Sequence, residues 1–242
     1  MIDPLTLALV GIVVAIGSVS QRITGIGIAL ISAPALSLVF GPATAVPLSN
    51  IAALVLNLTI LASAIRFVDL RRAVTIAATA AIVIVPVAHR LRSVDPTVVQ
   101  TAIGVIVLAA IALTYWLRAH GRPMRDTTLA RISAGAAAGA FGVAAGLSGP
   151  PLAVYAAGTA WRGPTFVPTV QAASAVTNVI AIAAAPRVAV PFSVWASILA
   201  AVGAGAVLGS VLAPRVHARH VENAALLLAA GGAIMVIAAA AL

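Results

Sequence analysis

The sequence predicts an all-α polytopic membrane protein with two homologous halves and eight to ten membrane-embedded helices, some of them short and interrupted. Three observations support this fold class. Of the 242 residues, 62% are hydrophobic and 8% are charged, whereas a soluble domain carries about 25% charged residues. Several apolar runs reach the roughly 20 residues that a helix needs to cross a bilayer. Rare residues of the first half also recur 121 residues later in the second half.

Charged residues divide the chain into ten apolar segments, five in each half. The first half, residues 1–120, is expected to embed segments at about 5–21, 26–40, 43–65, 73–88 and 97–117. The second half, residues 121–242, is expected to embed segments at about 131–147, 150–160, 164–185, 193–213 and 222–242. The second segment of each half is too short for a full crossing, so we expect a half-helix or a re-entrant piece there.

The two halves share rare residues at one fixed spacing. The pairs separated by 121 positions are Gly25 and Gly146, Pro47 and Pro168, Asn57 and Asn178, and Arg66 and Arg187. Asn50 and Gln171, which both carry a side-chain amide, correspond in the same way. We interpret this recurrence as an internal duplication that forms one integral membrane domain.

The arginines predict an orientation, because all 14 basic residues are arginines. If all ten segments cross, eleven arginines fall on one side of the membrane, and Arg90, Arg92 and Arg187 fall on the other. If the short segments do not cross, the division is eight to six. Basic residues concentrate in cytoplasmic loops, so the first arrangement is favoured. It gives each half an odd number of crossings, which predicts inverted repeats with both termini outside.

Two stretches interrupt the apolar pattern at matching places, residues 24–34 and residues 145–155. Both combine glycine, proline and hydroxyl residues. Irregular backbone at membrane depth must be buried in protein or line a wet cavity, and paired interruptions indicate a transporter's substrate site. A helix that begins just after such a glycine presents free N–H groups and a positive dipole end, which together attract an anion. The alternative is that the glycines only permit close helix packing.

The candidate substrate-binding residues are those near the two interruptions and the polar residues at equivalent places in the third segments. They are Thr24, Gly25, Gly27, Ser32, Asn50, Asn57, Gly146, Ser148, Gly149, Gln171 and Asn178. Amide and hydroxyl groups can donate hydrogen bonds to the oxygens of an anion. Two alternatives stay open: hydroxyls can bond back to their own helix, and a buried asparagine can hold two helices together.

The missing groups narrow the function further. The five acidic residues and four histidines all lie at segment ends or in loops. This distribution disfavours an intramembrane hydrolase, a cation channel with acidic rings and a carboxylate-based proton exchanger. The chain has no cysteine, and no large polar face is left for nucleic acid. We expect a transporter rather than an enzyme, with no metal and no cofactor. The alternative is a non-transporting membrane protein, such as an assembly partner or a lipid-handling enzyme.

The first half resembles the TauE/SafE family of sulfite exporters and anion permeases. The stretches that carry the resemblance are residues 21–34, 41–42, 45–48 and 66–69, with residues 146–152 and Asn178 in the second half. The sequence departs from the family pattern at Gly27-Ile28, where a longer glycine run is common, and after Arg187, where no aspartate follows.

The resemblance implies passage of small anions, such as sulfite or sulfonates, across the bacterial inner membrane. The expected partners are therefore a small anionic substrate and the lipid bilayer, with a homo-oligomer possible. For a transporter, we expect segments 24–34 and 145–155 to meet near the middle of the membrane and to form one site between the two halves.

Overall fold

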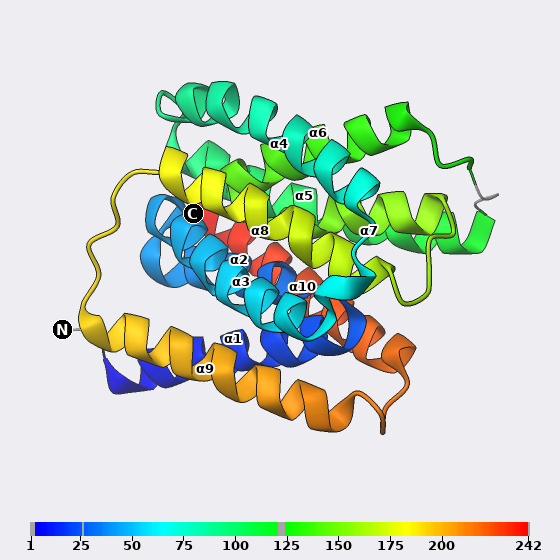
Figure 1. Ribbon diagram of the computed structural model, residues 1–242. Coiled ribbons are helices and arrows are strands. Elements are labelled where there is room, and N and C mark those ends of the chain that lie inside the picture. The colour runs from blue at the N-terminus through cyan, green and yellow to red at the C-terminus, as the bar shows by residue number, and fades with distance from the viewer. Residues whose placement is uncertain (1–2, 26, 121–123, 242) are drawn as a thin grey trace.

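The computed structural model describes residues 3–25, 27–120 and 124–241, and the regular elements in this part of the chain are all helices (Figure 1). The elements of the first half are α1 (Pro4–Thr24), α2 (Ile28–Phe40), α3 (Pro42–Ala64), the 3₁₀ turn η1 (Ile65–Phe67), α4 (Leu70–Leu91) and α5 (Pro96–His120). Those of the second half are α6 (Thr128–Ala145), α7 (Gly149–Gly158), α8 (Phe166–Ala184), α9 (Phe192–Leu212) and α10 (Ala218–Ala240).

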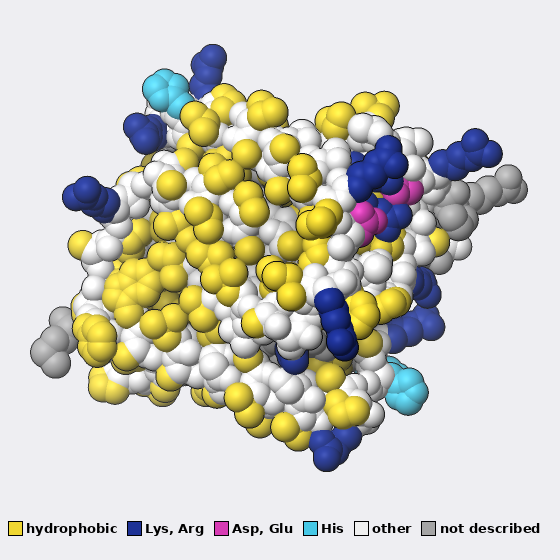
Figure 2. Space-filling model, in the orientation of Figure 1, with side chains coloured by type: hydrophobic (Ala, Val, Ile, Leu, Met, Phe, Trp, Pro, Cys, Tyr) yellow, Lys and Arg dark blue, Asp and Glu magenta, His cyan; other side chains and the backbone are white. Residues whose placement is uncertain are grey.

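Eight of the helices in the described residues are long and apolar enough to cross a membrane. The two others are α2, with 13 residues, and α7, with 10 residues. The predicted all-α polytopic fold is thus confirmed, including a short second segment in each half. Large apolar side chains face outward, among them Ile82 and Phe192, which are 74% and 82% exposed. Figure 2 shows hydrophobic side chains across the middle of one face and arginines toward its margins, as expected for a surface covered by lipid.

Helices at equivalent positions of the two halves make equivalent contacts. The first helix of each half packs on the fourth helix of the other half: α1 lies against α9, and α6 lies against α4. The third helices, α3 and α8, pack on each other, as do the last helices, α5 and α10. The two halves thus interlock, and each hydrophobic core cluster of the described residues combines side chains from both.

The helix is interrupted between α1 and α2 and again between α6 and α7, and we call these two places the breaks. The helices that lead into them end in the same way. The helices α1 and α6 end at Gly25 and Gly146, whose φ angles of 84° and 71° are left-handed, a conformation that favours glycine. A Cβ atom on Gly25 would lie 2.9 Å from Val167 Cγ2 of α8. A Cβ atom on Gly146 would lie 3.1 Å from Ser49 Cβ of α3. Each break is therefore wedged against the third helix of the other half.

Close backbone approach joins α6 to α4. A Cβ atom on Gly135 would lie 2.5 Å from the Ile76 oxygen, and one on Gly139 would lie 2.6 Å from the Ala80 oxygen. Small residues at such spacing allow two membrane helices to pack backbone to backbone. The contact leaves no space for a side chain at either glycine.

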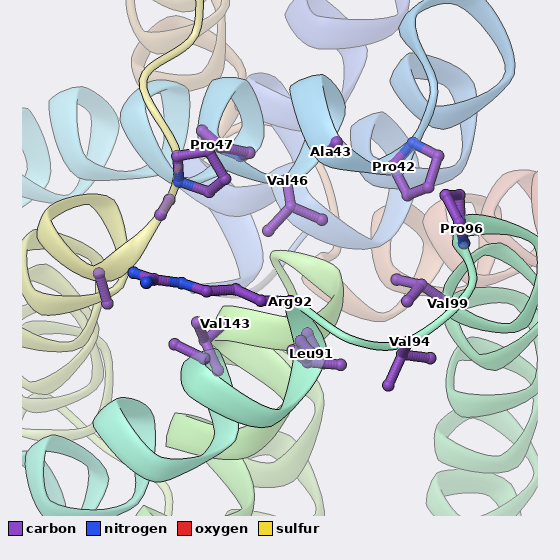
Figure 3. A pocket seen from close by; sticks show the side chains of 15 residues that line it. Pro42, Ala43, Val46, Pro47, Leu91, Arg92, Val94, Pro96, Val99 and Val143 are labelled. Atoms are coloured by element: carbon purple, nitrogen blue, oxygen red, sulfur yellow. The ribbon is translucent and has the colours of Figure 1, made fainter.

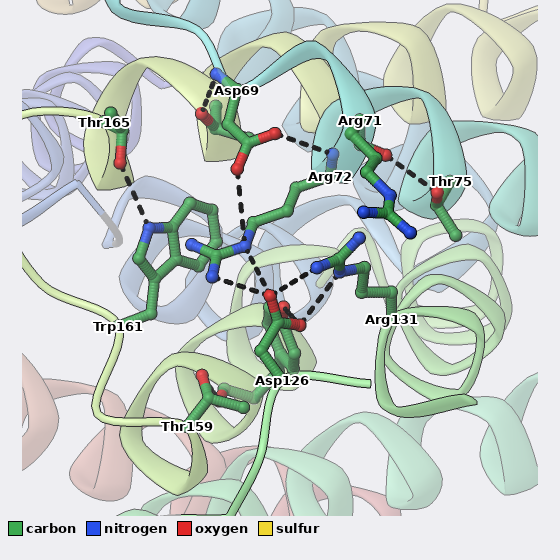
Figure 4. Close-up of polar contacts among 11 residues, drawn as sticks. Asp69, Arg71, Arg72, Thr75, Asp126, Arg131, Thr159, Trp161 and Thr165 are labelled. Atoms are coloured by element: carbon green, nitrogen blue, oxygen red, sulfur yellow. Dashed lines mark hydrogen bonds and ion pairs between the residues drawn. The ribbon is translucent and has the colours of Figure 1, made fainter. Parts of the chain in front are cut away.

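A cluster of charged and aromatic residues fixes the segment that precedes α6 (Figure 4). Asp126 accepts hydrogen bonds from Arg131 Nε at 2.8 Å, from the Tyr155 hydroxyl at 2.6 Å and from Arg72 Nη2 at 2.7 Å. The Arg72 guanidinium also stacks on the Trp161 ring at 4.4 Å. The hydrogen bond from Arg131, helped by those from Tyr155 and Arg72, holds the pKa of the Asp126 carboxyl well below its usual range. The cluster thereby joins α4, α6 and α7.

Substitution of Gly139 by alanine should destabilise the protein, because the new methyl group would meet backbone atoms of Ala80. Overpacking of this kind costs about 1–3 kcal/mol. The matched control is Gly203→Ala in α9, where nothing lies within 4 Å of an added Cβ. Thermal unfolding in detergent should show a lower midpoint for Gly139→Ala and an unchanged or higher midpoint for Gly203→Ala. Equal midpoints for the two variants would contradict the close packing of α6 on α4.

Substitution of Asp126 by asparagine should destabilise the protein at neutral pH by roughly 1–3 kcal/mol, because two arginines lose their carboxylate. A lowered pKa in the folded state means that this stabilisation is complete above the ordinary aspartate pKa, about 4. It is lost as the pH falls from there toward the folded value. The difference in unfolding midpoint between the wild type and Asp126→Asn should therefore stay constant from pH 7 to about pH 5 and begin to narrow below about pH 4. The control Asp95→Asn, at an exposed position, should match the wild type throughout.

Candidate functional site

A small internal cavity of about 20 Å³ lies where the two breaks meet. Its lining comes from both breaks and from the third helices: Gln21, Gly25, Gly27, Ala29, Leu30, Ala53, Asn57, Ser148, Gly149, Pro150, Val170, Gln171 and Ser174. Equivalent residues of the two halves both contribute, for example Gly27 and Ser148, or Ala53 and Ser174. We call this space the central cavity. It lies between the two halves, and its volume holds about one water molecule.

Three side-chain amides form a buried network beside the central cavity. Gln21 Nε2 donates to Asn57 Oδ1 at 2.6 Å and to Gln171 Oε1 at 3.0 Å. Gln171 Nε2 in turn donates to the Gly25 carbonyl at 2.8 Å. This last bond satisfies a backbone group that the break in the chain leaves open. The network thus connects α1, α3 and α8 across the two halves.

The amino ends of α2 and α7 both border the central cavity. The Ile28 N–H donates to Gln21 Oε1 at 3.2 Å, so a side-chain amide already occupies the start of α2. Ser148, the residue before α7, makes no side-chain capping hydrogen bond. The Nδ2 atom of Asn57 has no hydrogen-bond partner among the described residues, although Asn57 is only 1% exposed. The cavity therefore combines two positive dipole ends with an unused donor.

A second polar group lies beside the other break. Asn50 Nδ2 donates to the Gly142 carbonyl at 3.1 Å, as Gln171 does to Gly25 in the first half. Four buried atoms here have no partner within the described part of the chain: Ser49 Oγ, Asn50 Oδ1, Asn178 Nδ2 and Asn178 Oδ1. We call Ser49, Asn50 and Asn178 the α6-side polar group. A buried polar atom without a partner is costly, which sets this group apart from the satisfied amide network beside the central cavity.

A larger cavity of about 310 Å³ opens next to the α6-side polar group (Figure 3). We call it the vestibule. Its walls are apolar except for Arg92: Pro42, Ala43, Val46, Pro47, Ala88, Leu91, Val94, Pro96, Val99, Val143, Ala144, Ala184, Ala185 and Pro186. The guanidinium of Arg92 extends across the cavity in Figure 3. Arg90 and Arg187 adjoin these lining residues in the sequence. The vestibule therefore lies at the end of the bundle that carries Arg90, Arg92 and Arg187, the end with fewer arginines.

The equivalent place in the other half is filled. Arg22 stands 121 residues before Val143, which is a wall of the vestibule. The Arg22 guanidinium Nε donates to Ser210 Oγ at 3.2 Å, and a Cβ atom on Gly209 would lie 2.6 Å from Arg22 Cβ. In this conformation, α1 and α9 therefore pack tightly at the place that corresponds to the vestibule, and no second vestibule opens there among the described residues.

Six of the eleven residues that the sequence singled out line the central cavity: Gly25, Gly27, Asn57, Ser148, Gly149 and Gln171. Asn50 and Asn178 belong to the α6-side polar group, and Gly146 is the break beside it. The remaining two use their hydroxyls within their own helices. Thr24 Oγ1 donates to the Ser20 carbonyl at 2.9 Å, and Ser32 Oγ donates to the Ile28 carbonyl at 2.7 Å.

Gln21 and Ser174 were not among the predicted site residues, although both line the central cavity. A usable signal existed for Gln21: a glutamine inside an otherwise apolar helix needs partners, and it opens the stretch that carries the family resemblance. The described residues contain no group of three or more His, Cys, Asp or Glu side chains that could bind a metal ion.

The comparison with protein families gives one match. The family model described as sulfite exporter TauE/SafE covers residues 9–241. No curated protein and no solved structure matches the chain. The match spans nearly the whole chain and includes both breaks, all eleven predicted site residues and the vestibule. The chain belongs to the sulfite exporter TauE/SafE family and is a multi-pass membrane transporter of small anions.

Proposed function

We propose that the central cavity is the substrate site and that the substrate is a small sulfur oxyanion such as sulfite, or a sulfonate. The observation that carries this proposal is the meeting of two helix amino ends at one buried place. Each dipole end favours a negative charge by roughly 0.3–1 kcal/mol, and by up to about 2 kcal/mol when partly buried. Two such ends bind weakly enough for the anion to leave again, which transport requires.

The donors around the cavity fit an oxyanion. Asn57 Nδ2 has no hydrogen-bond partner among the described residues, and Ser148 and Ser174 add hydroxyl groups to the lining. The described residues that line the cavity include no carboxylate, so none of them repels an anion. Because the cavity holds only about 20 Å³, the described conformation is closed around the site. The anion enters when the helices beside it move apart.

The asymmetry of the two ends supports alternating access. The vestibule approaches the site from the end with Arg90, Arg92 and Arg187, while the contact between Arg22 and Ser210 closes the other end. In Figure 1, the equivalent helices α1 and α6 run in opposite directions, which supports the predicted inverted repeats. We propose that the two halves exchange conformations, so that the vestibule closes while an equivalent one opens at Arg22.

The arginines support an orientation for this cycle. Eleven of the 14 arginines belong to loops and helix ends on the side opposite the vestibule, by the division derived from the sequence. We propose that this side is cytoplasmic and that the membrane is the bacterial inner membrane. The vestibule then faces outward, as do both termini, and its arginine offers an attractive charge to anions outside the membrane.

Transport of radiolabelled sulfite into vesicles that contain the purified protein tests the proposed function. Uptake should saturate, and unlabelled sulfite or a small sulfonate should compete with it. Empty vesicles are the control. If folded protein moves no small anion in either direction, the proposed function is wrong.

Replacement of Asn57 by leucine should lower sulfite uptake at least about tenfold, because the site loses its free donor and Gln21 loses an acceptor; a tenfold loss corresponds to about 1.4 kcal/mol. Asn57→Asp keeps the size of the side chain and adds a repelling charge, so it should lower uptake by at least as much. The matched control is Thr59→Ala on the same helix, since the exposed Thr59 hydroxyl only donates to the Val55 carbonyl. Unchanged uptake in both Asn57 variants, with unfolding midpoints near that of the wild type, would remove Asn57 from the site.

A further inference from the structure

We infer that the α6-side polar group binds a monovalent cation. The experiment below uses Na⁺ to test this. The ion would lie between the side-chain oxygens of Ser49, Asn50 and Asn178, beside the break between α6 and α7. This site is separate from the proposed anion site in the central cavity, and binding of the cation does not depend on the proposed function.

The first support is the set of buried oxygens without partners. Ser49 and Asn178 are 0% exposed and Asn50 is 1% exposed. Ser49 Oγ, Asn50 Oδ1 and Asn178 Oδ1 accept no hydrogen bond from any described residue. Buried oxygens of this kind are nearly always satisfied in proteins. Ser49 and Asn50 lie at the end of α6, where Ser49 contacts Gly146 and Asn50 bonds to Gly142. Asn178 is the counterpart of Asn57, which bonds to Gln21 in the first half.

The second support comes from the equivalent place in the first half. There, Gln21 Nε2 lies between Asn57 Oδ1 and Gln171 Oε1 and donates to both. The positions that correspond to Asn57 and Gln171 are Asn178 and Asn50. The position that corresponds to Gln21 is Gly142. The second half thus keeps the two acceptors and lacks the positively polarised group that lies between them.

The third support is the electrostatic character of the place. The end of α6 carries the negative end of a helix dipole, which favours a cation. In secondary transporters, the carboxyl ends of broken helices and neutral oxygens bind the coupling ion. All the oxygens offered here are neutral, whereas Ca²⁺ and Mg²⁺ prefer carboxylates. The composition of the site therefore fits an ion of single charge.

The ion has a route to this site. Val46 and Pro47 of α3 line the vestibule and lie within one helical turn of Ser49 and Asn50. Val143 of α6 lines it as well and follows Gly142 directly. The vestibule therefore adjoins the α6-side polar group, although none of that group's three residues lines the vestibule. A cation that enters this way must pass Arg92.

The test is thermal unfolding of the full-length protein in detergent, in NaCl, KCl or choline chloride at one fixed chloride concentration and without sulfite. Na⁺ should raise the midpoint by roughly 2–6 °C relative to choline, with a saturable dependence on concentration. If NaCl, KCl and choline chloride give the same midpoint, the polar group holds only water, and the inference is wrong.

Two variants at Gly142 make the test specific. Gly142→Gln should abolish the effect of Na⁺, because the new amide can take the place that Gln21 Nε2 has in the first half. Gly142→Ala adds a methyl group without an amide and should keep the effect; its Cβ would lie 3.3 Å from Thr177 Cγ2. If Gly142→Gln keeps the full effect, the inferred position of the ion is wrong.

Ser49→Ala gives an independent measurement in case Gly142→Gln does not fold. It removes one oxygen and should lower the apparent affinity for Na⁺ about tenfold; an unchanged affinity would contradict the site. Failure of the two proposals can be told apart, because stabilisation by Na⁺ requires no transport. Sulfite uptake without any effect of Na⁺ would refute the cation site alone. Stabilisation by Na⁺ without sulfite uptake would refute the anion site alone.

Discussion

The architecture depends on one constraint, that backbone groups inside a bilayer must find their hydrogen bonds within the protein. Two helices end at membrane depth, at Gly25 and Gly146, and the carbonyls of their last turns lose their helical partners. A side-chain amide from the opposite half donates to a carbonyl near each break. Gln171 replaces the missing partner of the Gly25 carbonyl, and Asn50 adds a second hydrogen bond to the Gly142 carbonyl, which also accepts one from the Gly146 N–H. Both breaks lie where the two halves meet and receive a hydrogen bond from the opposite half, and the candidate site lies between them.

The two breaks are equivalent in position and different in chemistry. Gln21 occupies the space beside the first break and bonds to Asn57, Gln171 and the Ile28 N–H. Gly142 leaves the corresponding space beside the second break to something outside the chain. The same difference extends to the ends of the bundle, where Arg22 fills the place that is open at Val143. In this conformation the first break has a side-chain amide, that of Gln21, between its two acceptors, and the second break has none. A transporter needs such an asymmetry in any single conformation.

The sequence predicted the helices and the breaks, because both follow from local rules. Long apolar runs define the eight spans, and Gly25 with Gly146 defines the breaks through left-handed caps that favour glycine. The hydrogen-bond partners of the polar side chains could not be predicted in this way, because they depend on tertiary packing. Thr24 and Ser32 share the composition of the breaks, yet their hydroxyls bond back to their own helices. The central position of Gln21 depends on how α1, α3 and α8 meet, which no spacing in the chain specifies.

The central claim is that an anion binds between the amino ends of α2 and α7. The most direct measurement is a crystal structure of the protein with selenite, a heavier analogue of sulfite, located by its anomalous scattering. The account predicts a selenium peak within hydrogen-bonding reach of Ser148, Gly149 and Asn57, with the central cavity enlarged around it. Selenite bound only at surface arginines, or α6 and α7 forming one continuous helix, would contradict it.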